Sequence, residues 1–135
     1  DEGVTVIAAH GCSSGLVFCE RYVPTFLNLV RCYPNFYSDV SALTLPNRFG
    51  MLLRLRRHPE THSRLLFGTD YPHLVFRWPC HGRAGEESWG EIGRTDNRFD
   101  KQYLFLKYLG VGFRSMEGLL PMPSCSPPMA RPGKQ

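Results

Sequence analysis

The first apolar run of the chain reads Val4-Thr5-Val6-Ile7-Ala8-Ala9, and it ends at His10. The run is rich in β-branched residues and nearly continuous in its hydrophobicity, which is typical of a strand buried on both faces in a parallel sheet. Residues 11–15 are mainly glycine and serine, a composition that marks a loop. The sequence therefore predicts a parallel strand over residues 4–9 with a loop at its carboxyl end.

The rest of the chain alternates helical and strand patterns. Tyr22, Phe26 and Val30 fall on one stripe of a helix that Pro34 ends, and later runs show the same alternation. Strands that alternate with single helices imply right-handed βαβ crossovers and a parallel sheet, so the predicted fold class is α/β. The expected elements after the first strand are a helix over 20–33, a strand over 36–41, a helix over 46–57, a strand over 64–68, a mostly irregular stretch over 73–95 and a helix over 97–109.

Composition and charge indicate a globular chain. Hydrophobic residues make up 42% of the 135 residues, and the formal charge of +4 is too small and scattered to indicate nucleic acid or an anionic membrane as partner. No apolar run reaches the roughly 20 residues of a membrane-spanning helix, and no signal-peptide pattern precedes the first strand. Because the chain starts with Asp1 and not Met, we expect a processed or truncated front end.

Cysteine usage and the tail complete the general expectations. The five cysteines are odd in number and form no Cys-x-x-Cys pair, which predicts free thiols in a reducing compartment and a cytoplasmic location. Residues 121–135 hold five prolines and few large apolar side chains, so we expect a disordered Pro-rich tail after one domain over 1–120.

Residues with functional chemistry follow each expected strand. His10 ends the first strand, Asp39 and Ser41 lie at the end of the second, and Asp70 ends the third. Functional groups of parallel α/β folds gather at the carboxyl ends of the strands. Imidazole and carboxylate groups there could bind Zn²⁺, Mn²⁺ or Fe²⁺, or could move protons to and from water. The simpler alternative is a set of hydrogen-bonded loop residues, with Asp39 supporting its strand end.

Other polar groups give weaker indications. His58 and His62 have helical i, i+4 spacing, but the proline between them breaks the helix that would align them. The pair Cys80-His81, together with His73, only loosely resembles a set of metal ligands. The arginines within residues 54–64 lack interleaved aromatic residues, so they indicate a solvated helix face and not a nucleic-acid site.

Three segments, taken in order, resemble a known family. They read Val-Ile-Ala-Ala-His-Gly at 6–11, Asn-Phe-Tyr-Ser-Asp-Val-Ser-Ala-Leu at 35–43 and Leu-Leu-Phe-Gly-Thr-Asp-Tyr-Pro at 65–72. They are similar to the last three strands of amidohydrolase-related TIM-barrel metal-dependent hydrolases, in the branch that includes aminocarboxymuconate-semialdehyde decarboxylase. The resemblance implies a partial (β/α)8 TIM barrel: its last three strand–helix units, strands six to eight, with a C-terminal helix. It covers residues 3–75 and, more loosely, the helix that ends at Leu109-Gly110.

The resemblance also implies roles for two residues. Asp70, at the end of the eighth barrel strand, would be a metal ligand or a base acting on metal-bound water. His10, at the end of the sixth, would be the active-site histidine, a proton shuttle in the decarboxylases and a metal ligand in other members. The implied cofactor is a divalent metal, with zinc favoured, and the implied substrate is a small carboxylate-type molecule. Neither hydrolysis nor decarboxylation is preferred.

The chain departs from this family in its metal ligands. The His-x-His pair of the family's first strand does not occur in the sequence, and the strand that carries a further ligand is missing. A barrel takes roughly 250 residues, so three strands should expose two sheet edges and the barrel-facing sides of Ile7, Tyr37 and Leu66. We therefore expect a chain that is inactive alone and that either self-associates through its exposed sheet edges or is only marginally stable. The alternative is a non-catalytic pseudo-enzyme or relic that acts by binding a partner.

Overall fold

The computed structural model describes residues 3–15, 20–76 and 86–114. Within them, three short strands form one open parallel sheet in the order β1-β2-β3. The register pairs Ala8 with Ser38 and Ser38 with Leu65, so the strands bring their carboxyl ends to the same edge. The expected tail, residues 121–135, and residues 77–85 of the stretch expected to be irregular lie outside the described residues. The strands are β1 (Val6–Ala8), β2 (Phe36–Asp39) and β3 (Leu65–Leu66).

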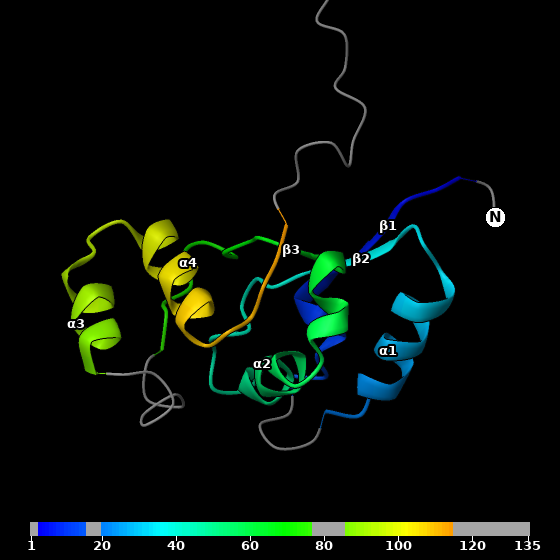
Figure 1. Ribbon diagram of the computed structural model, residues 1–135, viewed down its shortest axis with the longest axis horizontal. Helices are drawn as coiled ribbons and strands as arrows, with labels where there is room; N and C mark the ends of the chain where they lie inside the picture. Colours follow the sequence, from blue (N-terminus) through cyan, green and yellow to red (C-terminus); the bar gives the residue numbers. More distant parts are fainter. Residues whose placement is uncertain (1–2, 16–19, 77–85, 115–135) are drawn as a thin grey trace, which may run out of the picture.

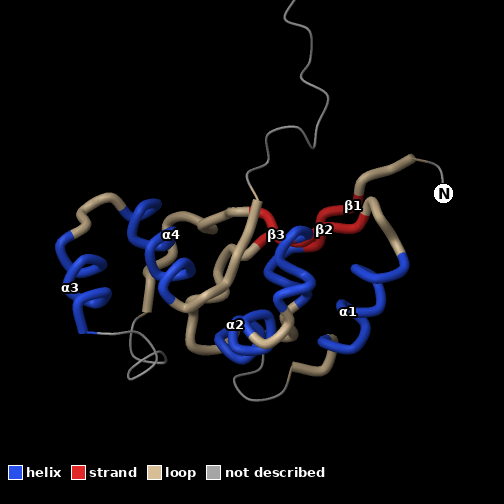
Figure 2. Tube along the Cα trace, viewed as in Figure 1, coloured by secondary structure: helices blue, strands red, loops and turns tan. Residues whose placement is uncertain are grey.

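Helices connect the strands in the predicted alternation. Figure 2 shows the two connecting helices, α1 and α2, on one side of the strands, as two right-handed crossovers in the same direction require. The α/β class with an open, three-stranded parallel sheet is thereby confirmed. The helices are α1 (Val23–Cys32), α2 (Phe49–Arg56), α3 (Glu86–Arg94) and α4 (Arg98–Tyr108), with the 3-10 turns η1 (Ala9–Cys12) and η2 (Pro59–Arg64) (Figure 1).

The core is formed by the sheet and by residues of all four helices. In β2, Phe36 and Ser38 are buried while Tyr37 and Asp39 are partly exposed, which is the alternation of a strand with one covered face. Phe26 of α1 is fully buried and packs edge-on against Phe36, with ring centroids 6.2 Å apart. The buried cluster consists of Phe26, Phe36, Val40, Leu43, Phe49, Met51, Leu52, Leu55, Leu65, Ile92, Phe105, Leu106, Leu109 and Val111.

Helix α3 falls in a stretch that the sequence predicted to be irregular. Its two glycines, Gly90 and Gly93, lower its intrinsic helix propensity. Ile92, however, is fully buried, and the ring of Trp89 lies 5.8 Å from that of Phe105 on α4. Packing against α4 therefore outweighs the weak local preference, and the prediction of an irregular stretch over residues 86–94 was wrong.

Helix α4 was predicted correctly in position and only in part in the face that it buries. The side chain of Asn97 caps it by accepting a 2.8 Å hydrogen bond from the backbone N–H of Phe99. The sequence places Phe99, Tyr103 and Leu106 on one apolar stripe of this helix. Leu106 is buried as expected, but Phe99 and Tyr103 are 50% and 45% exposed. The helix also buries Gln102 and Phe105.

The two sheet edges differ from each other. At the outer edge of β3, the Arg114 N–H donates to Leu65 O at 2.7 Å and Arg114 O accepts from the Phe67 N–H at 3.1 Å. The chain that leaves α4 therefore pairs with β3, and the expectation of two exposed edges was wrong for this one. The expectation that Leu66 is exposed was also wrong, because it is buried, whereas Ile7 on the edge strand β1 is 37% exposed.

Candidate functional site

The carboxyl edge of the sheet brings the residues selected from the sequence together. His10 lies in η1 directly after β1, Asp39 is the last residue of β2, and Asp70 follows β3. His10 Nε2 lies 4.0 Å from Asp70 Oδ2, and His10 Nδ1 lies 3.8 Å from Asp39 Oδ1. The imidazole of His10 thus stands between two carboxylates that come from the two following strands. Its side chain is 24% exposed, so solvent still reaches it.

Asp39 fixes the loop that carries His10. Its Oδ1 accepts hydrogen bonds from the backbone N–H of His10 and from that of Ser41, each at 3.0 Å. The Ser41 hydroxyl also donates to the same oxygen. One carboxylate therefore ties the end of β1 to the end of β2, as the sequence reading of Asp39 as a support for its strand end predicted.

The contacts of the His10 ring determine which nitrogen carries the proton. Nδ1 lies 3.1 Å from the carbonyl oxygen of Ser41 and 2.9 Å from its hydroxyl oxygen. The carbonyl can only accept, and the hydroxyl already donates its single proton to Asp39. Nδ1 is therefore the donor to both oxygens. In the neutral ring, Nε2 carries the free lone pair, on the side of Asp70.

A second imidazole lies beside Asp70. His73 Nε2 is 3.5 Å from Asp70 Oδ2, and the His73 N–H donates to Asp70 O at 3.1 Å in the turn that the two residues form. Sequence reasoning considered His73 only with Cys80-His81, which lie outside the described residues. The sequence did hold a signal that His73 lies near Asp70. The two residues are three apart, on either side of Pro72, and such a spacing is typical of a turn.

The backbone is strained at both facing residues. His10 has a φ of 56° and Asp70 a φ of 55°, in the left-handed region that residues other than glycine rarely adopt. Two further residues near the strand ends, Cys12 and Ala42, have φ values of 58° and 54°. Such conformations cost about 1–3 kcal/mol each and concentrate at functional sites. Their position at the carboxyl edge supports a functional use of His10 and Asp70.

Cys12 lies close to this cluster but is not activated. Burial, followed by the negative charge of Asp39, raises the pKa of the Cys12 thiol above its usual value. A raised pKa keeps the group protonated near neutral pH, whereas nucleophilic or metal-binding cysteines act as thiolates. Cys12 is partly buried and packs against the buried cluster.

The donor groups do not by themselves complete a metal site. A catalytic zinc takes three protein ligands. Across residues 3–15, 20–76 and 86–114, no three His, Cys, Asp or Glu side chains are grouped so that they could hold a metal ion. The described residues do supply a base, His10, whose Nε2 lone pair is free, and a carboxylate, Asp70, that faces it. Together these two groups can accept a proton and stabilise the charge that it brings.

Comparison with known proteins adds no relative. No protein family model, no curated protein and no solved structure matches this chain. Among the helices of the described residues, none combines the length and the hydrophobicity that crossing a membrane requires.

Proposed function

We propose that the strand-end cluster is the proton-transfer part of a metal-dependent hydrolase or decarboxylase site of the amidohydrolase-related type. In this proposal the chain supplies the last three strand–helix units of the barrel. The observation that carries it is that His10 Nε2 faces Asp70 Oδ2 at 4.0 Å across two strand ends. Three further observations support the same proposal. The strands are parallel, their connecting helices lie on one side of the sheet (Figure 2), and the backbone is strained at both His10 and Asp70.

His10 is the group that moves the proton. Its neutral ring offers the Nε2 lone pair, and a separation of 4.0 Å from Asp70 is beyond hydrogen-bond range. A water or substrate atom that lies between the two groups can therefore contact both. When Nε2 takes up a proton, the Asp70 carboxylate stabilises the resulting positive charge by its proximity. The Asp39 carboxylate does so from the other side of the ring, 3.8 Å from Nδ1.

The cofactor and substrate belong to the proposal as well. Asp70 and His10 would lie at a divalent metal, with zinc favoured, only where ligands beyond the described residues join them. The substrate would be a small carboxylate-type molecule, and the location cytoplasmic. Because its own donors are too few, we expect the chain alone to be inactive.

Sequencing the gene or transcript upstream of the codon for Asp1 tests the barrel assignment. We expect an in-frame extension of about 150–200 residues, the balance of a barrel, with His-x-His after an apolar strand. Unrelated coding sequence or a stop codon directly upstream would overturn the assignment.

The roles of the two residues are tested in that complete protein. A His10→Ala or Asp70→Ala substitution should lower zinc-dependent turnover of a carboxylate substrate by on the order of 10²-fold or more, as loss of a general acid–base group does. His58→Ala is the matched control, since His58 pairs with the exposed Glu60 and is not part of the cluster. Equal activity of all three variants would contradict the assignment.

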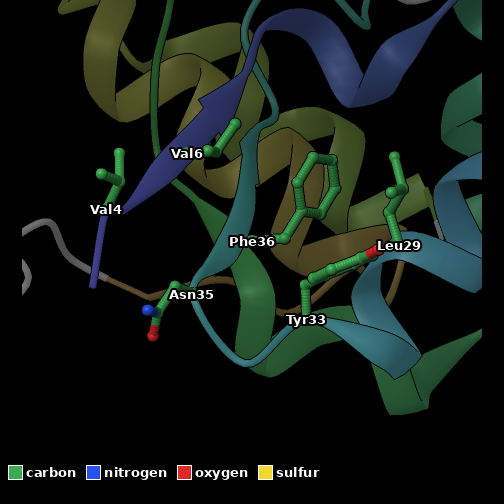
Figure 3. Close-up of a pocket in the computed structure, with 6 residues that line it drawn as sticks. All are labelled: Val4, Val6, Leu29, Tyr33, Asn35 and Phe36. Carbon is green, nitrogen blue, oxygen red and sulfur yellow. The ribbon is translucent and has the colours of Figure 1, made fainter. Parts of the chain in front are cut away.

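A second candidate function, partner binding, is favoured by an apolar groove beside β1. Figure 3 shows this groove between the edge strand and the end of α1, with Val6, Leu29 and Phe36 around it. Its volume is about 410 Å³, and Val4 and Val6 at its rim are 63% and 49% exposed. Exposed apolar surface at a sheet edge is a typical binding surface.

The partner that fits this edge is a second copy of the chain. The Val6 N–H donates to Asn35 O on the β2 side, so the backbone groups of Thr5 and Ile7 face outward. No other strand of the described residues pairs with that edge. Residues 4–9 carry no charge, so two copies can pair there in a two-fold arrangement without repulsion between like charges.

A further inference from the structure

We infer that Asp39 and Ser41 form a relay that sets the proton on His10 Nδ1 and thereby makes Nε2 the working nitrogen. Asp39 contacts the backbone N–H of His10 and Ser41 contacts Nδ1, whereas Asp70 lies at Nε2, so both are positioning residues. The use of this relay in catalysis rests on the proposed function. The placement of the proton on His10 Nδ1 does not depend on it.

The relay follows from a count of protons. The Ser41 hydroxyl has one proton, and it donates that proton to Asp39 Oδ1. Its oxygen, 2.9 Å from His10 Nδ1, therefore meets the ring with a lone pair. If Asp39 did not accept, the hydroxyl could rotate and donate to Nδ1, and the proton of the ring would then belong on Nε2. The carboxylate thus selects the tautomer through the serine.

Direct contact between Asp39 and the ring is not the means. Nδ1 and Asp39 Oδ1 are 3.8 Å apart, beyond hydrogen-bond distance. The same oxygen is occupied by the backbone N–H groups of His10 and Ser41, each at 3.0 Å. These bonds fix the distance between the carboxylate and the serine and so keep the hydroxyl aligned.

The experiment is a two-dimensional NMR measurement of the imidazole nitrogen shifts of ¹⁵N-labelled protein, at a pH where the rings are neutral. His10 is expected as the Nδ1–H tautomer. His62 is an internal control with the opposite tautomer, because its Nδ1 accepts from the Gly112 N–H at 3.0 Å and its Nε2 donates to Leu55 O at 3.0 Å. A His10 ring with its proton on Nε2 in the unsubstituted chain would overturn the inference.

Substitutions separate the relay from the carbonyl contact. Ser41→Ala removes one of two acceptors and should shift the His10 tautomer ratio toward Nε2–H by about 2- to 10-fold, the range of one net hydrogen bond. Ser41→Thr keeps the hydroxyl and should restore the ratio. If Ser41→Ala leaves the ratio unchanged while His62 keeps its signals, the relay does not exist.

A double substitution tests whether Asp39 acts through Ser41. Asp39→Asn alone should also shift the ratio, and the combined variant should shift it by less than the product of the two single effects, because both changes interrupt one path. Multiplicative effects would mean that Asp39 acts on the ring independently and would overturn the relay. If these shifts are as expected but His10→Ala leaves the complete protein active, the relay stands and the proposed function fails.

Discussion

Gly68 lies directly against Ser41, the residue that contacts the His10 ring. A Cβ atom at Gly68 would come within 3.2 Å of Ser41 Cβ and 3.6 Å of Asp39 Cβ. The backbone leaving β3 therefore passes the end of β2 at a distance that only glycine permits without displacement. The carbonyl of Gly68 accepts a 2.8 Å hydrogen bond from Gln102 Nε2 of α4. Helix α4 thus supports the candidate site although it contributes no group to it.

Replacing Gly68 with alanine should disturb both stability and the His10 ring. The added methyl must push Ser41 aside by a few tenths of an ångström, and overpacking of this kind costs about 1–3 kcal/mol. Urea unfolding should show the loss, and the His10 and Ser41 amide signals should shift.

Gly90→Ala is the matched control. Gly90 lies in α3, and the atoms nearest to a Cβ there would be those of the flexible Arg94 guanidinium, at 3.8 Å or more. Alanine in a helix interior should stabilise the protein by about 0.5–1 kcal/mol relative to glycine. If Gly68→Ala were as stable as the unsubstituted chain, the close approach of β3 to Ser41 would be wrong.

Gln102→Leu should destabilise the chain through a single lost hydrogen bond. Gln102 is 2% exposed, and leucine has a similar size but leaves the Gly68 carbonyl without this donor. An unsatisfied buried polar group costs about 1–3 kcal/mol. Lys107→Leu, on an exposed position of the same helix, should change stability by less than about 0.5 kcal/mol. Equal unfolding midpoints for the two variants would contradict the role of Gln102.

The sequence predicted which polar residues lie together at the strand ends better than it predicted the helices around them. His10, Asp39 and Asp70 were found because parallel strands end at one edge, a rule that depends only on strand order. The direction of the His10 ring was not predictable, since it depends on a φ of 56° and on the hydroxyl of Ser41. Helix α3 was missed because packing of Ile92, and not local propensity, stabilises it.

The face of α4 was misjudged for a related reason. Phe99 and Tyr103 form an apolar stripe that a sequence reading places in the core, but both are about half exposed. Tyr103 packs edge-on against Phe67 and Phe113, at centroid distances of 6.3 and 5.6 Å. The buried polar residue of the helix is Gln102, and its partner in β3's exit loop is visible only in three dimensions.

Cys12 should react more slowly with thiol reagents than Cys32. Burial and the charge of Asp39 raise the Cys12 pKa, so less thiolate is present at a given pH, whereas Cys32 is exposed. Alkylation by iodoacetamide at pH 8, followed by peptide mass mapping, gives both rates in one sample. Asp39→Asn should raise the Cys12 rate while leaving that of Cys32 unchanged. A Cys12 rate equal to that of Cys32 would contradict the raised pKa.

Zinc binding by the chain alone should be weak. Within the described residues, His10 faces Asp70, His73 lies beside Asp70, and these groups make no complete ligand set. Isothermal titration should give a binding free energy well short of the about 10 kcal/mol of structural zinc sites. Tight binding that is lost in Asp70→Asn, but retained in a control Asp100→Asn, would show that the chain holds zinc without further ligands.

The edge of β1 should make the chain self-associate, and a charge there should prevent it. Val6 is 49% exposed at the rim of the apolar groove, so Val6→Lys leaves the buried core intact. Lysine on an edge strand opposes pairing with another strand, because two copies would bring like charges together. Sedimentation analysis should show dimers that increase with concentration for the unsubstituted chain and monomers for Val6→Lys. Leu74→Lys, at a residue 56% exposed in the loop that follows β3, is the control and should still dimerise. A chain that stays monomeric at every concentration would contradict the pairing of two copies through β1, whereas equal loss of dimer in both variants would place the interface elsewhere.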